Sequence, residues 1–276
     1  REPLALPGIV FASGNRHNPT MNTTLILIFN FLKLFCPCQE FWVVICLIVM
    51  DSQGILYVVA TPIGNLGDIT LRAIEVLKEV DLVVAESTSR ALKLFSHYGI
   101  KNTILGISSY NEERRSVSII RNLKAGRKVA LVTAAGTPCI SDPGGILVSK
   151  CIAENIDVCA VPGASAVAAL VSVSGLFADR FVFYGFLPLK KGKRKKALEG
   201  LCSSPYPIVF YESPRRVEET LGYVLDIMGD RKMVMVKEMT KLFERTFRGT
   251  VSEVIAEVSG EEKRGEYAFI VAGSET

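Results

Sequence analysis

KVALVTAAGTPCISDPGG, residues 128–145, is the most informative stretch of the chain. Its first five residues have the apolar character of a buried strand, and an amphipathic helix is predicted to begin near Gly145. A strand that ends in a loop and resumes as a helix is typical of the carboxyl edge of a parallel sheet, where α/β proteins bind their ligands. The sequence therefore predicts an α/β fold with a ligand site at this loop.

The residues of this loop suit close contact with a ligand. Gly136 and Gly144 allow the backbone a positive φ or a close approach, and Pro138 stiffens the loop. Ser141 and Asp142 can cap the next helix or bind a hydroxyl or amine. The chain contains neither G-x-G-x-x-G nor G-x-x-x-x-G-K-[ST], so a nucleotide bound here would not sit in an ordinary dinucleotide or ATP site.

Outward from this loop, strands and helices alternate regularly from residue 50 to Gly175, which predicts a mainly parallel sheet. After Gly175 the pattern mixes crossovers with hairpin-like pairs, which predicts a mixed sheet. We therefore expect a first α/β domain over residues 50–176 and a second over 177–276. The strands expected are 55–61, 81–86, 103–107, 128–132, 156–161, 180–186, 207–211, 233–237, 242–248 and 267–272.

Residues 1–49 differ in character from the rest of the chain. They combine an irregular start with an apolar segment whose longest clean run, residues 41–50, is shorter than the roughly 20 residues of a spanning helix. A basic region and a small-residue cleavage site of a signal peptide are not evident. We interpret this part as sequence upstream of a natural start at Met50 and not part of the fold. The alternative is a membrane-associating or hydrophobic targeting segment.

Positive charge is concentrated in one run. Six of its seven residues are basic: Lys190, Lys191, Lys193, Arg194, Lys195 and Lys196. Without these six, the 32 basic residues fall to 26 against 28 acidic residues, so the basicity is a local patch. We expect the run to lie in a loop with Gly192 and to clamp phosphates of a nucleic acid, with Arg215 and Arg216 adding to it. The alternative is an ordinary solvated surface.

Cysteine and histidine usage limits the other classes of site. The seven cysteines form no C-x-x-C pair and are odd in number, which favours a reducing cytoplasm over a secreted disulfide framework. With only two histidines, a His-rich metal site is not expected. Cys139 is interpreted as a packed residue, because no neighbour in the sequence would activate its thiolate.

Several long motifs, in the same order, resemble the ribosomal RNA small subunit methyltransferase I family, the 16S rRNA (cytidine 2′-O)-methyltransferases. The motifs lie at residues 56–70, 135–144, 161–166, 185–188, 209–216 and 237–241. The resemblance covers residues 50–272. It implies the tetrapyrrole-methylase fold, in which two α/β domains hold S-adenosylmethionine between them, usually in a homodimer.

The resemblance also implies that S-adenosylmethionine is held by the loops 62–68, 136–142 and 162–166. This donor carries a sulfonium, an adenosine and an amino-acid end, and needs backbone polar groups, small residues and an apolar slot. The alternative is that the Gly and Pro residues of these loops only make turns. The residues expected to bind the donor are Pro62, Gly64, Asn65, Gly136, Thr137, Pro138, Ser141, Asp142, Pro162, Gly163, Ser165 and Ala166.

Methyl transfer requires the ribose 2′-oxygen, the methyl carbon and the sulfur to lie in line, and a base or cation should activate the hydroxyl. Charged candidates at strand ends are Glu86, Asp142, Glu212, Lys237, Glu238 and Lys241. We favour Glu86 and Glu238 as catalytic residues because Glu86 ends one predicted strand and Glu238 directly follows another. The alternative role for each is a helix cap or a surface ion pair.

The chain departs from the family pattern in three places. The family usually has Asp where this chain has Ala134, and Glu-Asp-Thr-Arg where it has ESTSR at residues 86–90. Many members also carry a further C-terminal basic segment, whereas this sequence stops at Thr276, just past its last predicted strand. These differences favour a catalytically impaired RNA-binding homologue as one alternative function. A methylase of a small tetrapyrrole is the other, although such a substrate would not need the lysine run.

Overall fold

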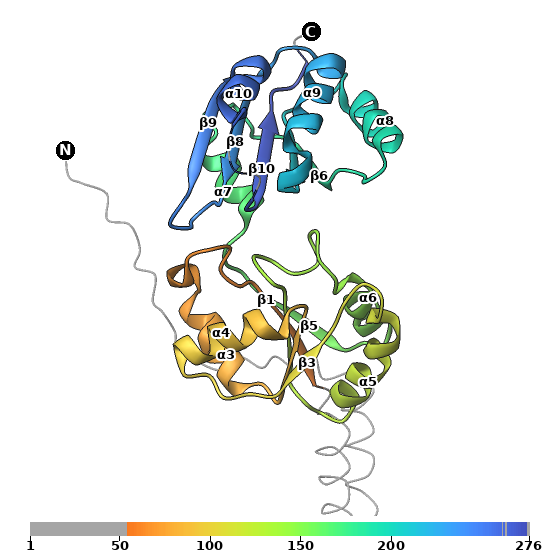
Figure 1. Cartoon of the computed structure of the whole chain (residues 1–276). Coiled ribbons are helices and arrows are strands. Elements are labelled where there is room, and N and C mark those ends of the chain that lie inside the picture. The colour runs from red at the N-terminus through yellow and green to blue at the C-terminus, as the bar shows by residue number, and fades with distance from the viewer. Residues whose placement is uncertain (1–53, 261, 263, 275–276) are drawn as a thin grey trace, which may run out of the picture. The chain divides into compact units, whose positions relative to one another are not determined.

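The computed structural model describes residues 54–260, 262 and 264–274. The interpretation of residues 1–49 and of a start at Met50 lies outside the described residues. Within the described part, the chain forms two five-stranded sheets, each covered by helices (Figure 1). No helix in this part of the chain is long and apolar enough to cross a membrane.

The first sheet is parallel throughout, as predicted, with strand order β3-β2-β4-β1-β5. Its strands are β1 (Ile55–Val59), β2 (Leu82–Ala85), β3 (Ile104–Gly106), β4 (Val129–Val132) and β5 (Asp157–Val161). All residues of β4 are buried, because this central strand has a paired neighbour on each side and helices on both faces. The loop that follows β4 therefore leaves the middle of the sheet.

Helices cover both faces of this sheet. They are α3 (Leu71–Glu79), α4 (Thr88–Tyr98), α5 (Glu112–Lys124) and α6 (Gly145–Ala153). Alternate strand residues point to opposite faces: Val83 packs with α3 and α4, whereas Val84 packs with α5 and α6. The 3-10 helix η1 (Leu66–Asp68) lies between β1 and α3, and Thr70 caps α3 with its hydroxyl. The sheet thus has two apolar cores and a loop-bearing carboxyl edge.

The second sheet is mixed, also as predicted, with order β6-β7-β10-β8-β9. Its strands are β6 (Val182–Phe186), β7 (Ile208–Glu212), β8 (Lys232–Lys237), β9 (Arg245–Thr250) and β10 (Tyr267–Val271). β6 and β7 are parallel, whereas β10 runs antiparallel to both of its neighbours, β7 and β8. The first residue of β10 consequently lies beside the last residues of β7 and β8.

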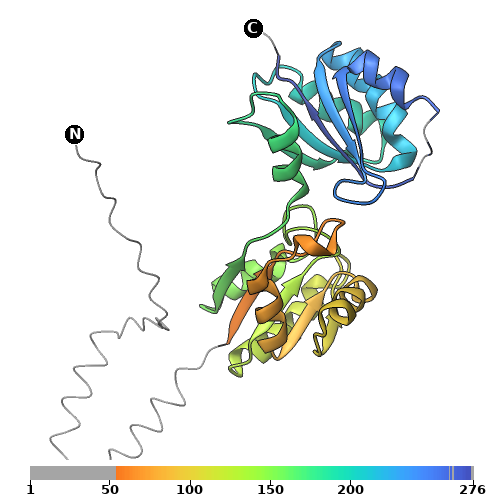
Figure 2. The same ribbon diagram turned by 90° about the vertical axis from the view of Figure 1, so that its left-hand side faces the viewer.

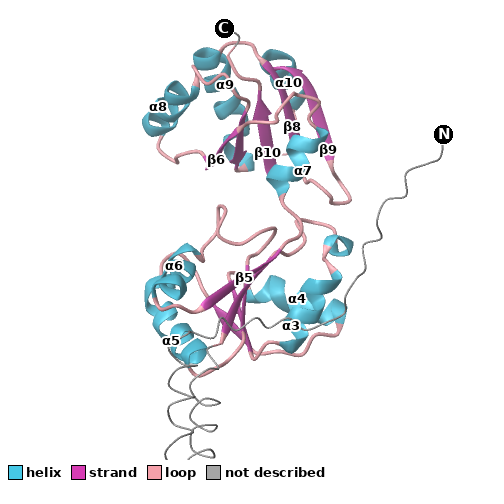
Figure 3. Cartoon of the chain, turned by 180° about the vertical axis from the view of Figure 1, so that it is seen from behind, coloured by secondary structure: helices cyan, strands magenta, loops and turns pink. Residues whose placement is uncertain are grey.

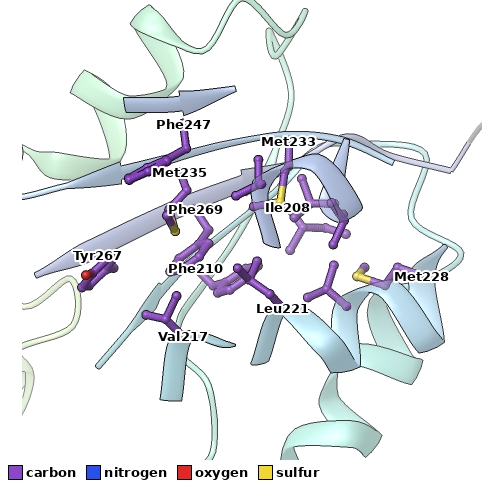
Figure 4. Packing of buried hydrophobic residues seen from close by; sticks show 14 of the residues in the cluster. Ile208, Phe210, Val217, Leu221, Met228, Met233, Met235, Phe247, Tyr267 and Phe269 are labelled. Carbon is purple, nitrogen blue, oxygen red and sulfur yellow. The ribbon is translucent and has the colours of Figure 1, made fainter. Parts of the chain in front are cut away.

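Helices also cover both faces of the second sheet (Figures 2 and 3). α7 (Ala166–Val173) packs on one face through Val167 and Leu170. The other face is covered by α8 (Lys191–Leu201), α9 (Val217–Met228) and α10 (Val251–Val258). Figure 4 shows the core on that side, where the rings of Phe210 and Phe269 stack 4.9 Å apart. The domain division at residues 176 and 177 stays a prediction, although α7, which precedes it, packs on the second sheet.

One predicted element is wrong. The basic run at residues 190–196 was expected in a loop, but the chain forms helix α8 from Lys191 to Leu201. Lys and Arg are good helix formers, and the single Gly192 in the first turn does not prevent the helix. Buried Arg194 and Leu198 are four residues apart on one side of α8 and anchor it to the protein.

Candidate functional site

A cavity of about 510 Å³ lies at the carboxyl edge of the first sheet and is lined by both sheets. The first sheet contributes residues that follow β1, β2, β4 and β5, including Ile63, Glu86 and Ser165. The second contributes Tyr211 at the end of β7 and Tyr267 at the start of β10, among others. Its volume is within the usual range of small-molecule sites.

The loop after β4 forms one wall of this cavity. It is fixed to the loop after β1 by two backbone hydrogen bonds, because the N–H of Thr61 donates to the oxygen of Gly136 (2.9 Å) and the N–H of Gly136 donates to the oxygen of Thr61 (3.0 Å). Cys139 adopts a φ of 67°, an uncommon conformation for a residue with a side chain. Burial, together with the negative charges of Glu112 and Asp142, raises the pKa of the Cys139 thiol to about 11. A thiol with this pKa is a poor nucleophile near neutral pH.

Four carboxylates line the cavity, a feature that the sequence only partly indicated: Glu86, Asp142, Glu212 and Glu266. Glu86 Oε2 accepts hydrogen bonds from Thr133 Oγ1 (2.7 Å) and from the backbone N–H of Ala134 (2.9 Å). Both bonds go to Oε2, which leaves Oε1 available to a ligand. Glu212 is almost fully buried and is bonded to Thr220, Ser213 and Arg216, so it serves the structure of the wall.

Asp142 has a perturbed proton affinity. Burial raises the pKa of its carboxyl above the ordinary range, the negative charges of Glu86 and Glu266 raise it further, and a hydrogen bond from Thr133 opposes this rise. Burial of the Tyr211 side chain raises the pKa of its hydroxyl to about 12, and the negative charge of Asp142 raises it further. The cavity therefore favours a cation, which would relieve the repulsion among its carboxylates.

The motif at residues 237–241 brings the second sheet against the loop after β1. Glu238 and Thr240 adopt positive φ angles of 55° and 64°, and Thr240 Oγ1 accepts a hydrogen bond from the N–H of Asn65 (3.1 Å). A Cβ added to Gly64 would lie 2.5 Å from Lys241 Cγ and 2.8 Å from the oxygen of Met239. Only glycine therefore fits at position 64 without displacing this motif.

The two predicted catalytic carboxylates occupy different environments. Glu86 lines the cavity. Glu238 pairs with Lys241 (2.8 Å) and accepts a hydrogen bond from the N–H of Glu266 (2.8 Å), and it is not among the cavity-lining residues. Burial alone would raise the pKa of Glu238, but these bonds outweigh burial and lower it. Of the other candidates, Lys237 is buried and donates to the oxygen of Glu262 (3.1 Å).

Half of the residues predicted to bind the donor line this cavity: Gly136, Thr137, Ser141, Asp142, Ser165 and Ala166. A second cavity of about 230 Å³ shares Ile63, Arg90 and two alanines with the first, and is also lined by Pro62, Gly64 and Lys241. Neither cavity is lined by Asn65, Pro138, Pro162 or Gly163. Asn65 instead caps η1 through its side chain.

Sequence reasoning missed several lining residues, chiefly those of the second sheet. They include Phe186, Met239, Glu266 and Tyr267. Met239 lies inside the motif at residues 237–241, so this motif could have indicated that Met239 lies at the site. Glu266 precedes a predicted strand instead of following one, and only the antiparallel direction of β10 brings it to this edge.

The basic run divides into buried and exposed members. Arg194 is 1% exposed. Its guanidinium donates to the oxygens of Pro188 and Leu189, to Thr220 and to Glu219. Lys191 pairs with Glu219, and Lys195 Nζ lies 4.6 Å from the centre of the Tyr223 ring. The remaining lysines of the run, 190, 193 and 196, are exposed.

The residues after β7 differ similarly. Arg216 is largely buried and its guanidinium contacts Glu212, Ser213 and the oxygen of Leu187. Arg215 is exposed. Among the residues that the structure describes, no group of His, Cys, Asp and Glu is arranged to hold a metal ion.

Residues 55–255 match the family model of Tetrapyrrole (Corrin/Porphyrin) Methylases. The chain is 46% identical over 223 residues to Ribosomal RNA small subunit methyltransferase I of Thermotoga maritima, covering 81% of this chain and 100% of the relative. It is 43% identical over 224 residues to the protein of the same name from Bacillus subtilis, covering 81% and 77%.

Two solved structures with the same fold are, by their names, methyltransferases. Uroporphyrin III C-methyl transferase from Thermus thermophilus superimposes with a TM-score of 0.59 at 22% identity, covering 79% of this chain and 97% of that one. Cobalt precorrin-4 methyltransferase gives 0.59 at 19% identity, covering 79% and 94%. At these identities the likeness shows the fold alone, in agreement with the predicted fold.

Proposed function

The chain belongs to the ribosomal RNA small subunit methyltransferase I family, and from this premise we propose that it methylates a cytidine ribose 2′-oxygen in 16S rRNA. As a member of this family it is a methyltransferase, and S-adenosylmethionine is its methyl donor. The observation that best supports this function is the cavity, whose carboxylates Glu86, Asp142 and Glu266 suit a cationic donor. The exposed lysines of α8 suit a polyanionic acceptor.

The cavity residues fit the donor chemically. Bound there, the donor supplies an electrophilic methyl carbon on a sulfonium, whose positive charge matches the carboxylates of Asp142 and Glu266. Backbone groups of the loop after β4 and the apolar side chains of Ile63 and Met239 provide the mixed surface that an adenosine needs. Volume and charge therefore agree with this donor.

Glu86 is the residue that we propose for proton transfer. Thr133 and Ala134 hold its Oε2, so the carboxylate is oriented and Oε1 can take the proton of the ribose hydroxyl. The loop after β4 aligns the reacting groups, which supplies much of the acceleration in such a displacement. Glu238 instead maintains the strained 237–241 motif through its bonds to Lys241 and the N–H of Glu266.

We further propose that the exposed lysines of α8 and Arg215 contact the phosphates of the acceptor RNA. Arg194 and Arg216, which the sequence placed in that surface, face the protein interior and support the helices instead. Phosphate contacts of this kind give affinity and salt dependence but no choice of base. The position of the methylated nucleotide is therefore set elsewhere.

A homodimer and a cytoplasmic location complete the proposal. Exposed apolar side chains occur closely spaced from the end of α7 through β6, at Val173, Phe177 and Tyr184, and a second copy of the chain is the partner that would cover them. The four cysteines in the described part of the chain are free thiols, which suits the reducing cytoplasm. Sedimentation of the full chain, with Phe177→Ser as the variant, tests the dimer.

Transfer of labelled methyl from S-adenosylmethionine to 30S subunits tests the function itself. The expected result is label in a 2′-O-methylcytidine of 16S rRNA with the wild-type chain and its loss in Glu86→Gln. Label in another nucleotide, or transfer to a tetrapyrrole in place of RNA, would overturn the substrate assignment.

An impaired homologue remains the second candidate because of Ala134 and Ser87. Ala134 lines the cavity where the family pattern has a carboxylate. Ser87, however, caps α4 by accepting a hydrogen bond from the N–H of Arg90, a role that Asp also performs. Binding of S-adenosylhomocysteine without any methyl transfer, and a gain of transfer in Ala134→Asp, would support the impaired homologue.

A further inference from the structure

Glu112 is a buried carboxylate with an unusual set of partners. It is the first residue of α5 and is only 4% exposed. Its Oε1 accepts hydrogen bonds from the backbone N–H groups of Gly144 (3.0 Å), Ile146 (2.8 Å) and Leu147 (3.1 Å). These donors belong to the start of α6 and its N-cap, so the carboxylate satisfies N–H groups that the helix itself leaves unpaired. Burying the charge is tolerated because it is bonded three times.

These bonds fix the end of the cavity loop. Ser141 and Asp142 line the cavity and lie only three and two residues, respectively, before Gly144. Gly144 itself has a φ of 131°, and a Cβ there would lie 2.6 Å from Leu131 Cδ2 and 2.7 Å from Cys139 Sγ. The loop therefore has little freedom at this end once Glu112 holds Gly144.

We infer that Glu112 is a positioning residue for the methyl donor, which it does not touch: it holds the loop so that Ser141 and Asp142 face the cavity. This inference rests on the proposed function, because it assumes that the donor occupies this cavity. The negative charge of Glu112 is felt within the loop, where it contributes to the raised pKa of the Cys139 thiol. A displaced loop would misplace both Ser141 and Asp142 relative to the bound donor.

The neighbouring residue provides a matched control. Glu113 pairs with Lys150 and thereby joins the same two helices, α5 and α6, but it does so at the surface, with its side chain 72% exposed. A substitution at Glu113 removes one carboxylate and one link between α5 and α6 without touching the loop. Any effect of Glu112 that arises only from helix packing should therefore appear in Glu113→Gln as well.

The experiment compares the full-length wild type with Glu112→Gln, Glu112→Ala and Glu113→Gln. Binding of S-adenosylhomocysteine is measured by calorimetry, well below the unfolding midpoint of each variant, and binding of 16S rRNA is measured separately. We expect Glu112→Ala to weaken S-adenosylhomocysteine binding by about tenfold or more. Glu112→Gln should weaken it by about threefold, because its amide oxygen still accepts these bonds but carries no charge. Binding of rRNA and the behaviour of Glu113→Gln should stay close to wild type.

The possible outcomes separate this inference from the proposed function. If the wild type does not bind S-adenosylhomocysteine, the proposed function itself fails. If the wild type binds and both folded Glu112 variants bind within twofold of it, Glu112 is not a positioning residue. Equal losses of donor and rRNA binding would also overturn the inference, since they indicate a general loss of structure. Should Glu112→Ala fail to fold, Glu112→Gln alone decides.

Discussion

The guanidinium of Arg90 lies 3.4 Å from the carboxylate of Glu266, and this contact joins α4 of the first sheet to the residue before β10 of the second. Both side chains are about half exposed, so the ion pair by itself adds little to stability. Both residues also line the cavity. Glu266 additionally pairs with Lys241 (3.1 Å). Its carboxylate therefore contacts two positively charged side chains, Arg90 and Lys241.

Replacing Glu266 with Gln should therefore affect ligand binding more than folding. The loss of one cavity carboxylate should weaken binding of S-adenosylmethionine by about three- to tenfold, through the lost attraction for the sulfonium. The free energy of unfolding should change by less than about 1 kcal/mol. Calorimetric binding and urea unfolding of the same preparation measure both. A large fall in the free energy of unfolding with unchanged binding would show that Glu266 has only a structural role.

Glu86 and Glu238 should respond differently to the same substitution. Glu86→Gln should lower kcat by about 100-fold or more, because an amide cannot accept the proton of the ribose hydroxyl. Glu238→Gln should lower it by less than about tenfold, since Glu238 acts through Lys241 and the N–H of Glu266 and can keep part of that bonding as an amide. Single-turnover methyl transfer to 30S subunits compares the two, and equal losses would refute this division of roles.

The fold was predictable because its signals are local. The strand β4 is indicated by its run of apolar residues. The Gly and Pro residues that follow indicate that the strand ends in a loop able to approach a ligand. Helix α9 (Val217–Met228) likewise carries a local signal, because its run of apolar residues at helical spacing ends directly before Gly229. These patterns depend on neighbours in the sequence, which is why reasoning from the sequence recovers them.

The contacts that define the site were not predictable in this way. Arg194 donates to Thr220, which lies 26 residues further along the chain. It is the one arginine among the five lysines of the run, but this identity alone does not say that its side chain is buried. Glu266 reaches the cavity only through the register of β10, whose Tyr267 pairs with Glu212 and Lys237. The positions of these side chains depend on contacts between residues far apart in the chain, and such contacts cannot be read from a single sequence.

Arg194 should behave as a structural residue and not as part of the RNA surface. Arg194→Ala leaves the oxygens of Pro188 and Leu189 and the hydroxyl of Thr220 without their buried donor, and should lower the free energy of unfolding by about 3 kcal/mol. Lys196→Ala, an exposed substitution on the same helix, should stay within about 0.5 kcal/mol of wild type. Urea denaturation monitored by circular dichroism distinguishes them, and equal stabilities would contradict the burial.

The exposed lysines of α8 should govern the salt dependence of RNA binding. Substituting Gln at positions 190, 193 and 196 should reduce the slope of log K against log salt by about 2 to 3, as expected for the loss of about three phosphate contacts. Substituting Gln for Lys191 and Lys195 should reduce it less, because Glu219 and Tyr223 already engage those side chains. Filter binding of 16S rRNA over a range of salt concentrations provides the slopes. Similar slopes for all three proteins would exclude α8 from the interface.

Donor binding should depend on pH through Asp142. Burial and two neighbouring carboxylates raise the pKa of this residue, so in the free protein the neutral form is favoured more than usual. A bound sulfonium favours the carboxylate and lowers the pKa again, which means that binding releases a proton and weakens as the pH falls through the raised value. As the pH falls from neutral through this raised pKa, the affinity of the wild type for S-adenosylmethionine should fall, whereas Asp142→Asn should bind more weakly at every pH but with a flatter profile. S-adenosylhomocysteine, which lacks the sulfonium charge, is the matched ligand and should show the smaller pH dependence. An Asp142→Asn profile as steep as that of the wild type would show that Asp142 is not the group responsible for the pH dependence.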